Sequence, residues 1–365
     1  MRFALAILIL IHGLIHLAGF VKAFQLAALP QLTRSISKPV GMLWLTTAIL
    51  FIIASVILLI KKDSWWIIGL AAVVTSQVLI SMYWTDARYG TIANVIILIA
   101  ALLSFGAWQF SQMLEKEVEE ITPPAQTRTF DKSSFDNLPE IVQNWLAATG
   151  AIDQSQSNFA IIKQRGEMKS APDGDWASFT ATHWVAFSSP AFVWNATMKA
   201  GPGMYVAVRD KFLHGKGSML VKVMSLVTLN DAIGKEIDEG ALQRYLAEIV
   251  WNPSFALNSD IKWVQTDSTH ATATLVDNGT SGTVTFTFDA NGLIEKVEAQ
   301  RFYYTGDQSK KEHWIVTMDG YKNFNGIKVP AESEITWNLK DGNYTWFRME
   351  FKISKSIHSY LWQLP

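Results

Sequence analysis

Two sets of polar residues in this 365-residue chain have the types and spacing to do chemistry. The first set begins with His12 and His16, which stand four residues apart in an apolar segment and so share one helix face. Gln77 and Asn94 lie in later apolar segments and could join them. Imidazoles inside a membrane segment are costly, and they can ligate haem or a metal, relay protons or hold helices together. No further ligand occurs at a diagnostic spacing, so packing, a metal or haem site, and a proton or ligand pathway all stay open.

The second set lies in the remainder of the chain. Arg244 and Glu248 are four residues apart on one face of a helix expected at 238–251. If a hairpin expected over 205–224 packs on that helix, carboxylates and cations converge there and could bind a ligand head group or act as acid and base. The same groups could equally form a solvated ion-pair network. We predict a ligand-binding set without catalytic residues: Asp210, His214, Lys222, Arg244, Glu248 and Trp251.

Common catalytic motifs are missing from the sequence. It contains no Gly-x-Ser-x-Gly elbow, no His-Glu-x-x-His and no Walker loop. The stretch His214–Ser218 lacks the full spacing of a phosphate cradle and is expected to be a hairpin turn. Cysteine is absent, and the net charge of −1 creates no field for nucleic acid. We expect no cofactor, no metal and no nucleic-acid partner, and the sequence does not indicate a protein partner.

The elements that must position the first set are four apolar segments. Each is close to the length of about 20 residues that crosses a hydrocarbon core of roughly 30 Å. We predict a membrane domain of four transmembrane helices over 1–112, with a retained first helix, in the inner (plasma) membrane of a bacterium. The lysines and arginines divide equally between the two sides, so the positive-inside rule does not orient the chain. The segments are 3–24, 40–60, 65–84 and 92–110.

The second set needs a different kind of domain. Thr122-Pro123-Pro124 ends any helix that continues from the membrane, so residues 113–130 are expected to be a linker and 131–365 a β-rich soluble domain. Asn291-Gly292 and Asp341-Gly342 are hairpin turns between alternating stretches. Roughly ten strands and two helices, at 139–150 and 238–251 with Asp238 as its cap, predict an α+β domain with an antiparallel, curled, half-barrel-like sheet.

Short patterns within about 135–355 resemble an uncharacterised family of bacterial proteins with one β-rich domain. The most specific is Arg244-Tyr-Leu-Ala-Glu-Ile-Val-Trp-Asn-Pro253, and others are Phe192-Val-Trp194 and Gly215-Lys-Gly217-Ser-Met219. Trp84–Asn94 resembles a version of the family with four helices in front. The resemblance implies no activity and no catalytic residues. The strand meander is also similar to the half-barrels of outer-membrane lipoprotein carriers, which implies an extracytoplasmic soluble domain.

Three functions are compatible with these patterns. The first is non-enzymatic binding or handling of a lipid or other apolar ligand at the bilayer, since ligand sites are largely apolar with a few placed polar groups. The second is an enzyme acting on a membrane-associated substrate. The third is a path for a small solute or a proton through the four helices. We expect the bilayer to be a partner in each case.

Overall fold

The computed structural model describes residues 2–123, 127–128, 132–152, 156–305 and 308–353. It divides into a helical unit, Met1–Met113 with Met224–Leu226, and a β-rich unit, Leu114–Val223 with Val227–Pro365. The expected start of the soluble domain at 131 and the end of the chain, 354–365, lie outside the described residues.

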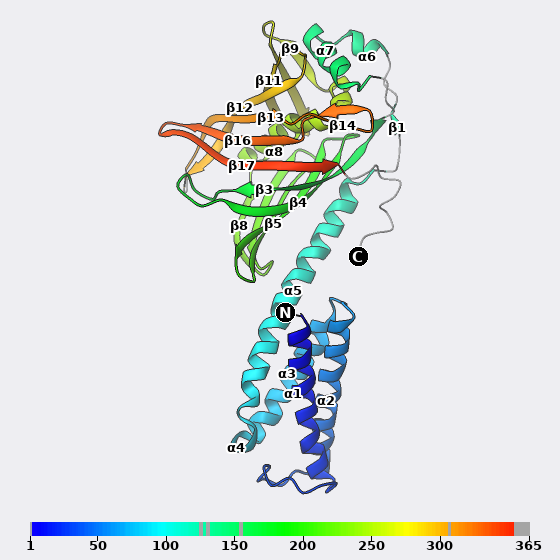
Figure 1. Ribbon diagram of the computed structural model, residues 1–365, viewed down its shortest axis with the longest axis vertical. Coiled ribbons are helices and arrows are strands. Elements are labelled where there is room, and N and C mark those ends of the chain that lie inside the picture. Colours follow the sequence, from blue (N-terminus) through cyan, green and yellow to red (C-terminus); the bar gives the residue numbers. More distant parts are fainter. Residues whose placement is uncertain (1, 124–126, 129–131, 153–155, 306–307, 354–365) are drawn as a thin grey trace. The chain divides into compact units, whose positions relative to one another are not determined.

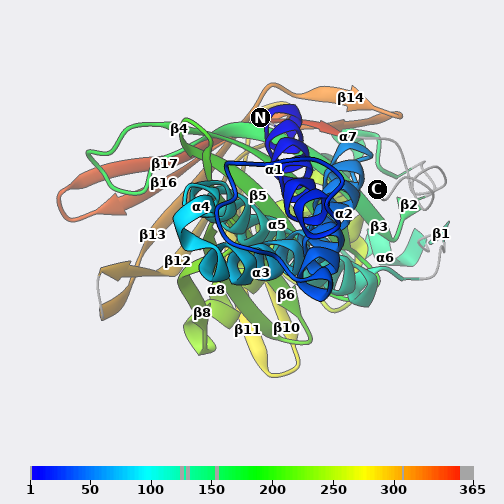
Figure 2. The same cartoon turned by 90° about the horizontal axis from the view of Figure 1, so that it is seen from below.

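The helical unit contains the four expected apolar helices, each long and apolar enough to cross a membrane. Viewed nearly end-on, they form one bundle (Figure 2). Its core contains buried side chains from all four, among them Ile9, Phe51, Val73 and Ile97. The helices are α1 (Arg2–Ala23), α2 (Lys38–Leu59), α3 (Trp65–Met82) and α5 (Gly90–Ile121), with a single turn, α4 (Trp84–Ala87), before α5.

Small residues bring α1 and α2 close together. A Cβ atom on Gly19 would lie 2.2 Å from a ring carbon of Trp44. A Cβ atom on Gly13 would lie 2.7 Å from Cβ of Phe51. Close backbone approach through small residues is how apolar helices gain packing energy in a bilayer, where no hydrophobic force drives them together.

The last turns of α5 belong to the β-rich unit. Helix α5 ends at Ile121, directly before Thr122-Pro123, as the sequence predicts. The buried carboxylate of Glu117 lies 3.2 Å from Arg209 Nε and 3.2 Å from Lys211 Nζ, both on strand β6 (Met204–Leu213). The first part of the expected linker is therefore an ordered helix end held by ion pairs.

Thirteen strands form one antiparallel sheet that curls around helix α8 (Figure 1). This confirms the predicted α+β architecture. Its order is β8-β7-β6-β5-β4-β3-β17-β16-β13-β12-β11-β10-β9. The strands are β3 (Phe159–Met168), β4 (Ala177–Ala186), β5 (Ala191–Gly201), β6 (Met204–Leu213), β7 (Lys216–Val223), β8 (Val227–Ile233), β9 (Lys262–Gln265), β10 (His270–Asp277), β11 (Thr280–Phe288), β12 (Ile294–Thr305), β13 (Gln308–Asp319), β16 (Glu332–Leu339) and β17 (Gly342–Ile353). Short pairs are β1 (Thr127–Arg128) with β2 (Gln156–Ser157) and β14 (Lys322–Phe324) with β15 (Ile327–Val329).

Three strands of the large sheet were not expected from the sequence. The edge strands β8 and β9 are short and largely exposed, so they lack a clean apolar alternation. Strand β13 begins with the charged run Lys310-Lys311-Glu312, which hides the alternation of its second half. The turns predicted at 214–218, 291–292 and 341–342 are confirmed.

The helices of this unit largely follow the sequence. Gly150 ends α7 with φ of 70°, as expected, and apolar residues of α8, such as Leu242 and Tyr245, are buried. The prediction of Asp238 as the cap of α8 is wrong, because Gly234 takes that position. The carboxylate of Asp238 instead accepts the backbone N–H of Gly217 at 2.8 Å. The helices are α6 (Lys132–Asp136), α7 (Glu140–Thr149) and α8 (Lys235–Ala247), followed by the 3₁₀ helices η1 (Glu248–Trp251) and η2 (Pro253–Leu257).

Aromatic side chains fill the space between the curled sheet and its helices. Trp145, Phe212, Phe286 and Trp314 are among the largest fully buried side chains, and all belong to one continuous core. Side chains at this density leave few voids larger than a water molecule. The aromatic side chains thus form a packed core.

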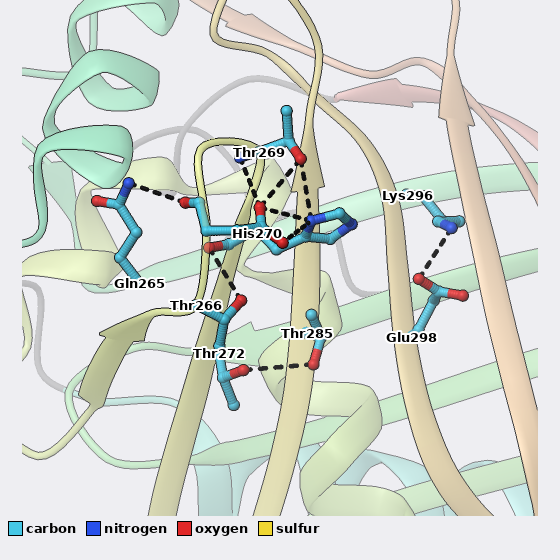
Figure 3. Close-up of polar contacts among 9 residues, drawn as sticks. Gln265, Thr266, Thr269, His270, Thr272, Thr285, Lys296 and Glu298 are labelled. Atoms are coloured by element: carbon cyan, nitrogen blue, oxygen red, sulfur yellow. Dashed lines mark hydrogen bonds and ion pairs between the residues drawn. The ribbon is translucent and has the colours of Figure 1, made fainter.

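Hydrogen bonds to one carboxylate hold the turn from β9 to β10 (Figure 3). The carboxylate of Asp267 accepts the Thr269 backbone N–H at 2.8 Å and the His270 imidazole at 2.8 Å. These bonds lower the pKa of Asp267 to about 2. A depressed pKa stabilises the fold above the unfolded value of about 4, and this contribution is lost as pH falls towards 2. Titration of the carboxyl groups followed by NMR should find the lowered pKa of Asp267. Thr269→Val keeps the backbone donor but loses the hydroxyl, so it should raise this pKa only part of the way. An ordinary aspartate pKa in the native chain would contradict these hydrogen bonds.

Candidate functional site

One face of the curled sheet, here called the inner face, packs against α8. Strand pairing places His183, Trp194, Asp210 and Met219 side by side on it, from β4 to β7. Side chains alternate between the two faces of a strand, so the neighbours His183, Asp210 and Trp194 share this face with buried residues such as Phe192 and Phe212. Two ionisable groups are thereby brought into an apolar core.

One side of helix α8 faces this row of inner-face residues. Gly240, Arg244 and Glu248 follow at intervals of four residues, so they lie along one side of the helix and its 3₁₀ extension. Arg244 donates from Nη1 to Asp210 Oδ2 at 2.7 Å and from Nε to Glu248 Oε1 at 2.8 Å. The sequence prediction that the 205–224 hairpin and this helix bring charges together is therefore realised for Asp210, Arg244 and Glu248.

His183 completes this ion cluster. Arg244 Nη2 faces its Nδ1 at 3.4 Å, and its Nε2 lies 3.2 Å from Glu248 Oε2. A guanidinium can only donate, so Nδ1 accepts and the proton sits on Nε2 towards the carboxylate. Burial lowers the pKa of His183 well below its usual range, so the ring is neutral. Burial also raises the pKa of Glu248, against the opposing pull of Arg244.

Aromatic rings enclose the Arg244 guanidinium. Its central carbon lies 5.0 Å from the ring centre of Phe192 and 5.0 Å from that of Trp194. Cation–π contacts of this kind gain strength where water is displaced. Arg244 is therefore held by Asp210, Glu248, His183 and two rings.

Arg301 is a second inner-face guanidinium beside this cluster. It lies on β12, two residues from buried Ala299, and its central carbon stacks 4.8 Å from the ring centre of Trp314. A Cβ atom on Gly240 would lie 3.0 Å from its Nε, so α8 leaves room for it there. No carboxylate of the described residues lies within ion-pair distance of it, and its cross-strand neighbour Glu312 pairs with Lys310 instead. Burial lowers the pKa of Arg301 to about 10.

The other predicted site residues divide between two places. Trp251 joins the cluster, with its ring centre 6.3 Å from that of His183. His214 stands exposed on the β6–β7 turn, and Lys222 lies further along β7, opposite Ala207. Neither forms a hydrogen bond or ion pair with Arg244 in the described part of the chain, so both lie outside the ion cluster.

Sequence reasoning missed His183 and Arg301. Each occupies an inward position of an alternating strand, in Phe179-x-Ala181-x-His183 and Val297-x-Ala299-x-Arg301. A charged or titratable residue at an apolar register position was the available signal. The strand register does not reveal which groups from distant parts of the chain contact such a residue across the core.

The first set of polar residues forms a hydrogen-bonded network among the apolar helices. His16 Nδ1 donates to the carbonyl of His12 at 2.8 Å, so its Nε2 accepts from Ser76 Oγ at 2.9 Å. His12 Nε2 lies 3.0 Å from Asn94 Oδ1. Asn94 in turn donates to Gln77 at 3.0 Å. The four predicted residues therefore meet through Ser76, which the sequence reasoning did not single out.

This network joins three helices by side chains that satisfy one another. His12 and His16 are buried, and their rings contact Phe51 and Trp44 of α2. Among the residues that the structure describes, no group of three His, Cys, Asp or Glu is placed to hold a metal. The contacts are those that the packing interpretation requires.

Removal of Arg244 should destabilise the β-rich unit strongly. Arg244→Met leaves Asp210 and Glu248 buried without their cation, which costs about 3–5 kcal/mol. The matched variant Arg165→Met breaks an exposed ion pair with Glu350 and should cost at most about 1 kcal/mol. Denaturant unfolding of the full chain in detergent, followed by tryptophan fluorescence, measures both. Equal losses would contradict the central role of Arg244.

Loss of the Ser76 hydroxyl should lower the stability of the helical unit. Ser76→Ala leaves His16 Nε2 without a donor inside the bundle, which should cost about 1–2 kcal/mol. Ser81→Ala, in the same helix, removes an exposed hydroxyl bonded to the Gln77 carbonyl and should cost little. Thermal unfolding in detergent compares the two. A larger loss for Ser81→Ala would argue against the network.

Comparison with solved structures finds similar folds. A LolA superfamily protein from Nitrosomonas europaea is 12% identical with a TM-score of 0.33, over 59% of this chain and 94% of that one. A DUF1329 family protein from Desulfovibrio piger is 9% identical with a TM-score of 0.34, over 60% and 90%. A beta-barrel-like protein of the DUF1849 domain from Brucella abortus is 11% identical with a TM-score of 0.19, over 54% and 95%.

No curated protein matches the sequence. The family described as "Family of unknown function (DUF6544)" matches residues 128–349, which include the β-rich unit's inner-face cluster and most of its sheet. This confirms the membership in an uncharacterised family that the short sequence patterns indicate. The chain belongs to the family of unknown function DUF6544.

Proposed function

We propose that this protein binds an amphipathic, lipid-like ligand at a membrane, with the anionic head of the ligand paired to Arg301, and releases it unchanged. The observation that carries the proposal is the state of Arg301. A guanidinium that is partly buried without a carboxylate within ion-pair distance has donors to offer, and burial disfavours its charge. A phosphate or carboxylate from outside the chain would satisfy both needs.

Apolar surface for the tail lies on the same face. Tyr303 follows Arg301 at the next inward position of β12, and its ring centre lies 5.0 Å from that of Trp337 on β16. Met198 and Val208 continue this face across β5 and β6 and are only partly buried. A partly buried aromatic ring next to one placed cation is compatible with the usual composition of a ligand site.

The ion cluster gives this site its rigidity. Arg244 forms ion pairs with both Asp210 and Glu248, and His183 is fully buried beside them. Arg244 is hydrogen-bonded to both Asp210 and Glu248, which suits a wall that positions Arg301 better than a set of catalytic groups. Trp251 belongs to the same wall, whereas His214 and Lys222 are assigned no part in it.

The four apolar helices would supply the membrane location. Their length and composition support a multi-pass anchor in the inner membrane of a bacterium. We place the soluble unit on the extracytoplasmic side, following the fold resemblance of the sequence. An anchored domain meets its lipid ligand at a high local concentration, so even modest affinity would suffice.

Lipid co-purification tests the proposal. The full chain is extracted in a mild detergent, and bound lipids are identified by mass spectrometry against a detergent-extracted control membrane protein. We expect anionic lipid at close to one molecule per chain. Arg301→Gln should reduce it about tenfold or more, because one charge-assisted contact is worth about 1.5–3 kcal/mol. Lys262→Gln, which removes an exposed positive charge of β9, is the matched control and should retain the lipid.

Two results would contradict the proposal. One is a native chain that carries no lipid above the control protein. The other is equal retention by Arg301→Gln and the native chain, which would separate the lipid from Arg301. Near-ultraviolet circular dichroism of each variant confirms that the aromatic core is intact, and Arg301→Lys tests whether charge without the planar fork is enough.

A further inference from the structure

The turn between β7 and β8, here called the hairpin tip, is Met224–Leu226. It belongs to the helical unit, although both of its strands belong to the sheet. A Cβ atom on Gly106 of α5 would lie 3.0 Å from Cβ of Leu226, so the glycine leaves room for the tip at this point of the helix. Position 106 of α5 therefore marks the level at which the hairpin tip meets the helical unit.

Aromatic rings mark this level of the helical unit as a membrane interface. The ring centre of Trp66, in the first turn of α3, lies 4.9 Å from that of Phe105 and 5.6 Å from that of Trp108. Tryptophan is enriched where a membrane span passes from hydrocarbon to headgroups. Gly106 stands between Phe105 and Trp108 in the sequence of α5. The hairpin tip is therefore at the headgroup level of the span that we propose for α5.

The strand that leaves the hairpin tip exposes apolar side chains. Val227 is 58% exposed and Leu229 is 61% exposed, on the strand that forms one edge of the sheet. Met204, which begins β6, is also exposed, and the pairing of β6 with β7 places it beside the same tip. An edge strand with open apolar side chains invites aggregation unless something covers it. Because a strand rises about 3.3 Å per residue, Leu229 stays within roughly 10 Å of the tip and so within reach of the bilayer.

An apolar row connects this exposed edge with the core. Residues directly opposite one another on neighbouring strands share a face of the sheet, and five such positions cross it from β4 to β8. The exposed fraction rises from 3% at Phe179 to 8% at Val206 and 58% at Val227. The apolar surface beside the hairpin tip is therefore the outer end of the core. The row consists of Phe179, Met198, Val206, Val223 and Val227.

The charges near the hairpin tip suit an anionic bilayer. Lys199 lies near the end of β5 and Lys222 near the end of β7, and neither forms an ion pair with a described residue. Between Lys199 and Asn230 the only acidic residue of the sequence is Asp210, which Arg244 holds in the ion cluster. Lysine beside an apolar contact surface extends its ammonium group to the polar layer. Apolar side chains flanked by lysines are typical of an element that lies in the membrane interface.

We propose that the β7–β8 hairpin inserts its exposed apolar side chains into the interfacial layer of the bilayer. Val227, Leu229 and the neighbouring Met204 contact the upper acyl chains, and the two lysines face the headgroup phosphates. The proposal rests on the four apolar helices spanning that bilayer. It requires no ligand at Arg301, since the partner is the lipid surface and not a single bound lipid.

Site-specific labelling tests this contact, because the chain contains no cysteine of its own. Leu229→Cys is labelled with bimane, and the full chain is reconstituted into vesicles of phosphatidylcholine and phosphatidylglycerol. A nitroxide on the upper part of the acyl chain should quench this label at least about twofold more than a nitroxide near the chain end, since interfacial elements reach only about 5–10 Å into the headgroup and acyl boundary. Val264→Cys is the matched control, because Val264 is 60% exposed on β9, the opposite edge strand, and we expect neither lipid to quench it.

Several outcomes would overturn the proposal. Absence of quenching at Leu229→Cys, or equal quenching at Val264→Cys, would exclude a specific contact of the hairpin with lipid. Blue-shifted emission at Leu229→Cys without quenching by either lipid would assign the apolar edge to a protein partner. Arg301→Gln in the labelled chain should leave the quenching unchanged. Its loss would show that the label reports on a lipid bound at the inner face, so this result separates the hairpin contact from the proposed function.

Discussion

A guanidinium inside a curled sheet must be neutralised and enclosed, and the inner face of this protein is organised around that requirement at Arg244. Strands β5 and β6 supply the rings of Phe192 and Trp194 and the carboxylate of Asp210. These contacts fix how far α8 is rotated about its axis and how far it is shifted along the sheet. With Arg244 fixed, Gly240 one turn earlier must face β12, and the space it leaves admits Arg301. One buried ion cluster thus determines where the second guanidinium lies.

The two faces of the sheet solve different electrostatic problems. On the inner face, the two carboxylates of Asp210 and Glu248 both pair with Arg244, and the second guanidinium, Arg301, stacks on an aromatic ring beside them. On the outer face, the arginines are paired and carboxylates remain in excess. The inner face therefore carries two guanidinium groups and two carboxylates in a partly buried setting, whereas the outer face is acidic.

The helical unit meets a similar constraint in an apolar setting. His12, His16 and Asn94 cannot turn to water within the bundle, so they satisfy one another through Ser76. A closed network of this kind gives the helices a defined register, which purely apolar surfaces would leave open. Hydrogen bonds of this kind are the ones that packing between apolar helices uses.

The sequence by itself determined the parts of this structure that depend on local order. Segment length and composition located the four apolar helices, alternation and the turns at Asn291-Gly292 and Asp341-Gly342 located most of the sheet, and the i, i+4 spacing paired Arg244 with Glu248. Only the tertiary structure decided that His183 meets Glu248 across 65 positions of the chain, that Gly240 makes room for Arg301, and that His214 and Lys222 stay apart from the cluster. The physical reason is that alternation fixes which face of the sheet a side chain occupies, whereas the curl of the sheet and the position of α8 on it fix the neighbours of that side chain. The curl and the helix position depend on contacts summed over the whole core, which no local sequence pattern contains.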